Sequence, residues 1–172
     1  MRGTLFAFLL CLLPLAVSGG TDNSILSNTG KLPVQPLAAP LAVPLESYES
    51  SVVAGGPGRD GIPSIDKPRF IPPEEADRYL SSDDIVFGVT LNGQAKAYPR
   101  GILVWHEVVN DRIGDRTISI TYCPLTGTAL GFERGDTTLG VSGQLVNSNL
   151  ILYDRATESL WPQILSTAIS AR

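Results

Sequence analysis

Histidine and cysteine are scarce in this sequence of 172 residues, which contains one His and two Cys. Cys11 lies inside an apolar N-terminal run, so Cys123 is the only cysteine expected in the mature chain. A single cysteine excludes an internal disulfide, and the core alone must then stabilise the domain. An odd thiol in an oxidising compartment is open to oxidation unless it is buried or used, so Cys123 needs an explanation.

Basic clusters are missing too, and aromatic residues do not alternate with Arg or Lys. The formal net charge is −4, from 13 basic and 17 acidic residues, and it becomes −5 when Arg2 is removed with the N-terminal segment. This balance argues against a nucleic-acid partner. The sequence also lacks a phosphate-binding glycine loop, a serine nucleophile elbow and the Cys or His spacing of structural metal sites.

One apolar run stands out, at residues 5–17, and no other segment has the apolar length of a membrane span. The run follows Arg2, precedes the small residues at 18–20 and is too short to cross a bilayer. Residues 1–20 are therefore predicted to be a signal peptide. The mature protein is expected in the periplasm or outside the cell, with association to the envelope left open.

Residues 21–58 have the composition of a linker. The stretch "LPVQPLAAPLAVPL" is rich in proline and favours an extended, polyproline-like backbone. We expect the linker to be disordered, although its hydrophobicity suggests that part of it lies against the domain. Its prolines are Pro33, Pro36, Pro40, Pro44 and Pro57.

Short strands separated by turns dominate residues 59–172, which we predict to form one β-rich domain. Asn92-Gly93 is a favoured two-residue hairpin turn, and "RTISITYCP" alternates between two faces. The predicted fold class is mainly β, with antiparallel strands and hairpins and one or two short helices. The chain ends abruptly after "SLWPQ", and we expect the domain to be incomplete at its C-terminus.

His106 and Cys123 are the rare residues that one hairpin brings together. With a turn centred near residues 113–114, opposite residues have numbers that sum to roughly 227 to 229, and these two sum to 229. Residues opposite each other in a strand pair lie about 4.5–5.5 Å apart. The register therefore predicts that the imidazole and the thiol meet at the open end of the hairpin.

Three interpretations of this pair remain open. In the first, His106 and Cys123 bind a metal, with copper or zinc suited to the donor types and Glu107 as a further ligand. In the second, His106 activates Cys123 as the nucleophile of a hydrolase or transferase, or as a redox centre. In the third, Cys123 is a small buried residue and His106 a hydrogen-bonded structural group, because free cysteine is among the most buried residue types.

Asn147, Asn149 and Asp154 are further candidates for ligand binding. They lie in "VNSNLILYDR", where polar side chains gather at a strand end. The alternative is that Asn147-Ser148-Asn149 builds a turn through hydrogen bonds from side chain to backbone, and that Asp154 and Arg155 form a turn or a surface pair.

Taken together, "AYPRGILVWHEVVND", "TYCPLTGTALGFER" and "GVSGQLVNSNLILYDRATESLWPQ" resemble the family of domains of unknown function numbered 3179, from about residue 60 to residue 163. The resemblance implies an exported or membrane-tethered prokaryotic protein and no known activity. Family members often continue past "SLWPQ", and some carry Cys-Pro-x-Cys where this chain has Thr126. The functions left open are a metal or redox site, a thiol enzyme, and a non-catalytic binding module of the envelope.

Overall fold

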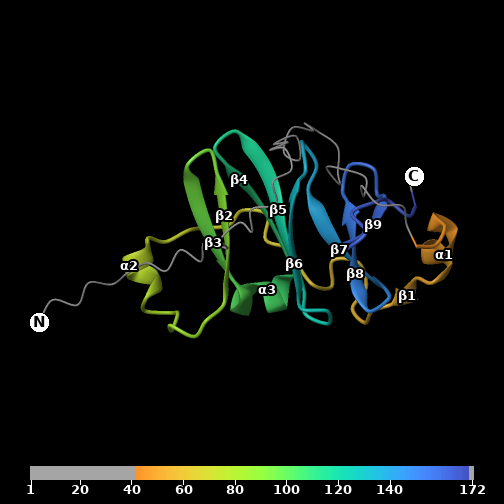
Figure 1. The fold of residues 1–172 in the computed structure, drawn as a ribbon, viewed down its shortest axis with the longest axis horizontal. Helices are drawn as coiled ribbons and strands as arrows, with labels where there is room; N and C mark the ends of the chain where they lie inside the picture. Colours follow the sequence, from red (N-terminus) through yellow and green to blue (C-terminus); the bar gives the residue numbers. More distant parts are fainter. Residues whose placement is uncertain (1–41, 171–172) are drawn as a thin grey trace, which may run out of the picture.

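The computed structural model describes residues 42–170, so the predicted signal peptide lies outside the described residues. Three β-layers follow one another across the molecule (Figure 1). A hairpin of β2 (Val86–Leu91) and β3 (Gln94–Pro99) forms the first layer, and α3 (Arg100–His106) follows it directly. The second layer is β4 (Val108–Ile113), β5 (Arg116–Cys123) and β6 (Thr128–Glu133).

The third layer is a four-stranded sheet in the order β1-β7-β8-β9. Its strands are β1 (Val53–Ala54), β7 (Leu139–Val146), β8 (Asn149–Asp154) and β9 (Leu160–Pro162). All pairings between these named strands are antiparallel. The mainly β, antiparallel fold class is confirmed, with three short helices in residues 42–170, the other two being α1 (Leu45–Ser50) and α2 (Pro73–Ala76).

The middle sheet is covered on both faces, and this double cover explains the burial of β5. On one face, Ile118, Ile120 and Tyr122 pack with side chains of β3 and α3. On the other face, Cys123 packs with side chains of β7 and β8. Each fully buried aliphatic side chain contributes about 1.5–3 kcal/mol. The alternation in "RTISITYC" thus separates two apolar interfaces, since neither face is exposed to solvent.

Residues before position 59 add to this core. α1 packs through Leu45 and Tyr48 beside Val146 and Ile151, on the outer side of the third layer. β1 pairs with β7, with Val53 opposite Leu145. The last part of the predicted linker therefore lies against the domain, whereas residues 21–41 lie outside the described residues.

The turn between β2 and β3 shows why this part of the sequence folds as a hairpin. Asn92 and Gly93 have φ angles of 49° and 76°, so the left-handed conformations that this turn requires fall on residues that tolerate them. The predicted β2–β3 hairpin is confirmed.

No helix within residues 42–170 has the length and apolar character needed to cross a membrane.

Candidate functional site

The β4–β5 hairpin has the register that the sequence predicts. Val108 pairs with Thr121, so the residue numbers of opposite residues sum to 229. The last rung is a hydrogen bond of 2.8 Å from the Tyr122 amide to the Glu107 carbonyl. Glu107, however, has φ 57° and ψ −28° and is the C-terminal cap of α3. This left-handed residue turns the chain out of the sheet, so His106 belongs to a helix and not to a strand opposite Cys123.

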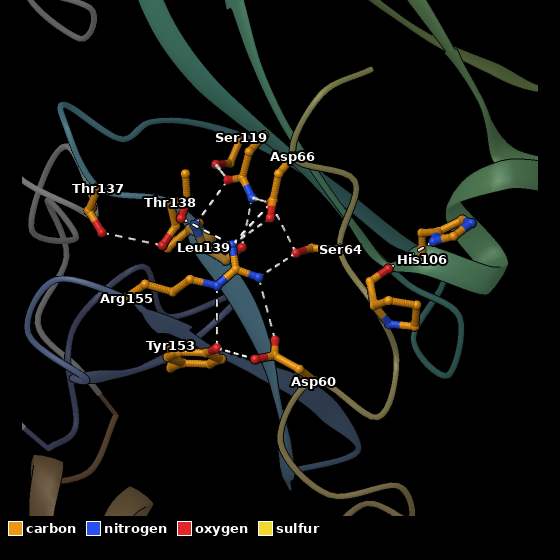
Figure 2. A network of polar contacts seen from close by, with 12 residues as sticks. Asp60, Ser64, Asp66, His106, Ser119, Thr137, Thr138, Leu139, Tyr153 and Arg155 are labelled. Carbon is orange, nitrogen blue, oxygen red and sulfur yellow. Dashed lines mark hydrogen bonds and ion pairs between the residues drawn. The ribbon is translucent and has the colours of Figure 1, made fainter. Parts of the chain in front are cut away.

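His106 is half-buried and contacts the loop that joins β1 to α2. Its Nδ1 lies 2.8 Å from the carbonyl oxygen of Pro63, away from the polar network to which the rest of that loop belongs (Figure 2). Because a carbonyl oxygen only accepts hydrogen bonds, Nδ1 carries the proton and donates it. The ring is thereby oriented by backbone, with Nε2 as its second polar atom.

Cys123 is 1% exposed and belongs to an apolar cluster between the second and third layers. Its Sγ lies 3.8 Å from the carbonyl oxygen of Ser148, to which the thiol donates. This contact suits the protonated thiol, because a thiolate has no proton to donate. A reactive thiolate needs a positive or polar surrounding and partial exposure, and the apolar packing of Cys123 provides neither.

The predicted metal ligands do not assemble. Within residues 42–170, no group of three or more His, Cys, Asp and Glu side chains is placed to hold a metal ion. Glu107, the proposed third ligand, is half-buried. Burial raises the pKa of this carboxyl group, which favours its protonated form.

The candidate ligand-binding residues serve the fold internally. Asn147 and Ser148 are the exposed residues of the β7–β8 turn, with φ angles of 49° and 61°, so the turn interpretation describes their backbone. The Asn149 amide group donates to Thr126 Oγ1 at 3.2 Å and to Gln163 Oε1 at 2.9 Å. Its Oδ1 accepts from the Ile164 amide at 3.0 Å.

Asp154 caps a turn at the opposite end of β8. Its carboxylate accepts from the amides of Ala156 and Thr157 and from Trp161 Nε1. Burial alone would raise the pKa of this carboxyl group, but hydrogen bonds from Thr157 and Trp161 outweigh that effect and lower it. Asp154 is 3% exposed, and its oxygens face these donors.

A polar cluster that sequence reasoning missed lies between the loop that joins β1 to α2 and the end of β8 (Figure 2). We call it the Arg155 cluster, and its members are Asp60, Ser64, Asp66, Asn110, Ser119, Tyr153 and Arg155. Arg155 Nη1 lies 3.0 Å from both carboxylate oxygens of Asp66, and its Nη2 donates to Ser64 Oγ at 2.7 Å. Contacts 89 and 91 residues apart in the chain leave no signal in local sequence.

Electrostatics hold the Arg155 cluster in its charged state. Partial burial would raise the pKa of Asp66, but hydrogen bonds from Asn110 and Arg155 lower it overall. Burial would lower the pKa of Arg155, but its contacts with Tyr153 and Asp66 raise it. Every buried side-chain nitrogen or oxygen within residues 42–170 has a hydrogen-bond partner, and the cluster is part of this satisfied network.

At its centre, Asn110 joins the second and third layers. Its Nδ2 donates to the Leu139 carbonyl at 2.8 Å, and its Oδ1 accepts from the Leu139 amide at 2.9 Å. Ser119 Oγ donates to the same Oδ1 at 2.6 Å, and Asp66 accepts from Nδ2 at 2.7 Å. The amide side chain thus pairs with the start of β7 as a neighbouring strand would.

Four segments taken from, or directly following, the three quoted sequence motifs meet at the end of the sheets opposite the Arg155 cluster. The Tyr122 amide reaches Glu107 next to α3, and the Cys123 thiol reaches the β7–β8 turn at Ser148. Asn149 reaches Thr126 in the β5–β6 turn, and the Ile164 amide reaches Asn149. In Figure 1, α3 and the β5–β6 turn lie together at the lower edge of the molecule.

This end carries large exposed apolar side chains. Trp105 is 76% exposed, Leu125 66%, Ile164 49% and Ile102 46%. Ile102 and Trp105 are three residues apart in α3 and therefore share a face. We call these four exposed side chains the apolar end.

A comparison with family models gives one match in the sequence. The family described as "Protein of unknown function (DUF3179)" covers residues 59–172. No curated protein and no solved structure matches the chain.

Proposed function

This chain belongs to the family described as "Protein of unknown function (DUF3179)", and we propose that it is a non-catalytic binding module of an exported protein. Its ligand is an extended, apolar segment of a polypeptide, bound at the apolar end. The observation that carries the proposal is the exposure of Trp105 and Leu125 at the point where four motif segments meet. An exposed tryptophan beside aliphatic side chains is typical of a binding surface.

The chemistry of the surface defines the ligand. No residue within 42–170 accepts a hydrogen bond from the Trp105 indole, so its N–H is available to a partner. Three of the four segments, 124–127, 146–149 and 162–165, contain no charged residue, and α3 carries Arg100 at its start. An extended, polyproline-like chain suits both features, because its carbonyl groups have no internal hydrogen bonds and its prolines stack on aromatic rings.

Burial of Cys123, the one cysteine within residues 42–170, supports a non-catalytic role over the thiol enzyme and the redox site. Cys123 donates to a backbone carbonyl inside an apolar cluster, and His106 donates to another backbone carbonyl. Neither residue lines the two best-formed hollows of the described chain, the larger of which is about 240 Å³ and lies around Arg59 and Glu158. Reacting groups of an enzyme need a concave, accessible site.

A thiol-labelling experiment separates these functions. In the binding module, Cys123 reacts slowly with a thiol reagent at neutral pH and rapidly once urea unfolds the domain. Fast labelling of the folded chain that is lost in His106→Ala would instead establish the thiol enzyme. Near-stoichiometric copper or zinc in protein prepared without chelators would establish the metal site.

A direct binding experiment uses a synthetic peptide, LPVQPLAAPL, as the extended apolar probe. To exclude competition from the matching residues of the chain itself, Val34 and Leu37 are changed to Ser in what we call the open variant. Both tryptophans carry 5-fluorotryptophan, and Trp105→Phe assigns the Trp105 fluorine resonance. We expect the peptide to shift this resonance in a saturable manner.

A matched control gives the experiment its specificity. Leu125→Ser in the open variant should weaken peptide binding at least tenfold. Tyr79→Ser removes a side chain that is equally exposed, at 73%, and lies after α2, so it should leave binding unchanged. No shift at any peptide concentration, or equal weakening by both substitutions, would refute the proposed function.

A further inference from the structure

The β2–β3 hairpin, the first layer in Figure 1, has an edge that no other strand covers. β2 pairs with β3 along one side, and within residues 42–170 no backbone hydrogen bond reaches its other side. The outer edges of β4 and β9 differ, because Ile65 bridges β4 and Ser170 bridges β9. An open strand edge is a template for pairing with another chain, and natural proteins usually cover it or place charges on it.

One hydrogen bond identifies the backbone groups that lie on this open edge. The Arg100 amide, which follows β3 directly, donates to the Ile85 carbonyl at 2.9 Å. The backbone groups of Ile85 therefore point toward β3. Because these groups alternate in direction along an antiparallel strand, those of every second residue point away from β3. The residues whose amides and carbonyls form the open edge are Val86, Gly88 and Thr90.

We propose that two copies of the chain pair through this edge, with β2 antiparallel to β2 across a twofold axis at Gly88. The three edge residues are placed symmetrically about Gly88, so Val86 of one copy lies opposite Thr90 of the other. Each opposite pair exchanges two hydrogen bonds, and the two hairpins join into one sheet. The contact involves none of the residues of the apolar end, so it is independent of the proposed function.

The charge pattern of the strand favours a second copy as the partner. Like charges directly opposite each other destabilise a strand pair, and a twofold axis places each residue of a strand near its own type. β2 has the sequence VFGVTL, without a charged residue, so its self-pairing brings no like charges together. Asp84, the nearest acidic residue before the strand, comes level with Asn92 of the second copy.

Pairing also covers apolar side chains that the single chain exposes. Ile85 is 52% exposed and Val86 43%. In the proposed register, Ile85 lies opposite Leu91 of the second copy, and removal of this apolar area from water adds to the hydrogen bonds. β2 supplies six residues, whereas a standard interface has about 20–30 residues a side. We therefore expect a reversible dimer that forms as the protein concentration rises.

Gly88 allows the register to be tested with charge. A Cβ at this position meets nothing within 4 Å, so the single chain has room for lysine or glutamate there. The same substitution in both copies places two like charges opposite each other at the twofold axis. Gly88→Lys in one copy and Gly88→Glu in the other place opposite charges there, which attract.

Sedimentation equilibrium of the chain without residues 1–20 measures the association. The unsubstituted chain should dimerise as its concentration rises, and Gly88→Lys and Gly88→Glu should each weaken the dimer by about tenfold or more. An equimolar mixture of these two variants should recover it. Gly101→Lys is the matched control, because it adds the same charge in α3 at a glycine that also has open space around it. This control should dimerise like the unsubstituted chain.

Hydrogen exchange reports on the strand edge itself. The amides of Val86, Gly88 and Thr90 should exchange fast in dilute protein and slowly in the dimer. The amides of Phe87 and Val89 point toward β3 and should be protected at both concentrations.

Three results would overturn the proposal. The first is a chain that stays monomeric at every concentration, and slow exchange of the edge amides in that monomer would mean that a different segment covers β2. The second is a dimer that Gly88→Lys leaves unchanged, which would place the contact elsewhere on the molecule. The third is a mixture of the two charge variants that stays monomeric, which would exclude a twofold axis at Gly88.

Discussion

Replacing Asn110 by alanine should destabilise the domain by a large fraction of its total stability. Asn110 is 1% exposed and bonds the amide and the carbonyl of Leu139 and the hydroxyl of Ser119. Alanine leaves these three buried groups without that partner, at about 1–2 kcal/mol each. A water molecule in the vacated space restores part of this loss, so we expect a decrease of about 3–5 kcal/mol. Domains of ordinary stability have about 5–15 kcal/mol in all.

Urea unfolding followed by tryptophan fluorescence measures this change, as a lower midpoint with an unchanged dependence on urea. Ser119→Ala is the matched control. It removes one donor and leaves Asn110 bonded to the Leu139 amide, so it should cost about 1 kcal/mol. An Asn110→Ala variant that loses no more stability than Ser119→Ala would refute the view that Asn110 joins the two layers through its hydrogen bonds.

Three further predictions concern other parts of the domain. Burial raises the pKa of Glu107, so the contribution of this residue to stability is greatest below the unfolded pKa of about 4.3 and is lost as pH rises through the folded pKa. Glu107→Gln should therefore stabilise the fold at pH 7 and not at pH 4. Equal changes in the urea midpoint at the two pH values would contradict this. Burial would raise the pKa of Asp154, but hydrogen bonds from Thr157 and Trp161 lower it overall, so the contribution of Asp154 to stability is present above about pH 3.9 and is lost as pH falls through the folded pKa. Asp154→Asn should cost about 1–3 kcal/mol of stability at pH 7 and reduce the loss of stability in acid. An unchanged acid transition would argue against this role. A Cβ at Gly140 would lie 2.4 Å from the Tyr153 ring, so Gly140→Ala should cost about 1–3 kcal/mol of stability in thermal unfolding. Gly88→Ala is the control, because a Cβ there meets nothing within 4 Å and should change stability little. Equal stability losses in the two variants would show that the Tyr153 ring moves aside at little cost.

Local patterns in the sequence predicted much of the fold. Asn92-Gly93 marked the first hairpin, and the residue sum of 229 gave the register of β4 and β5. The alternation around Cys123 separated the two faces of β5. It did not indicate what covers each face, because the covering strands lie elsewhere in the chain and alternation carries no information about layers.

The candidate site was harder to predict for two physical reasons. One left-handed residue, Glu107, separates His106 from the strand, and a glutamate gives no signal that it will adopt this conformation. Arg155 meets Asp60 and Asp66 across about half the chain, so its role is defined only by the folded structure. The predicted contact between His106 and Cys123 followed from a correct register that was continued two residues beyond the start of β4.

The pairing of β1 with β7 has a consequence for how the domain forms. Val53 meets Leu145, 92 residues later in the chain, since 145 − 53 = 92. Contacts between residues so distant in sequence raise the contact order and slow folding. Because the partner of β1 is β7, the third layer closes only after residue 145 has been synthesised, and until then β1 presents an unpaired strand edge.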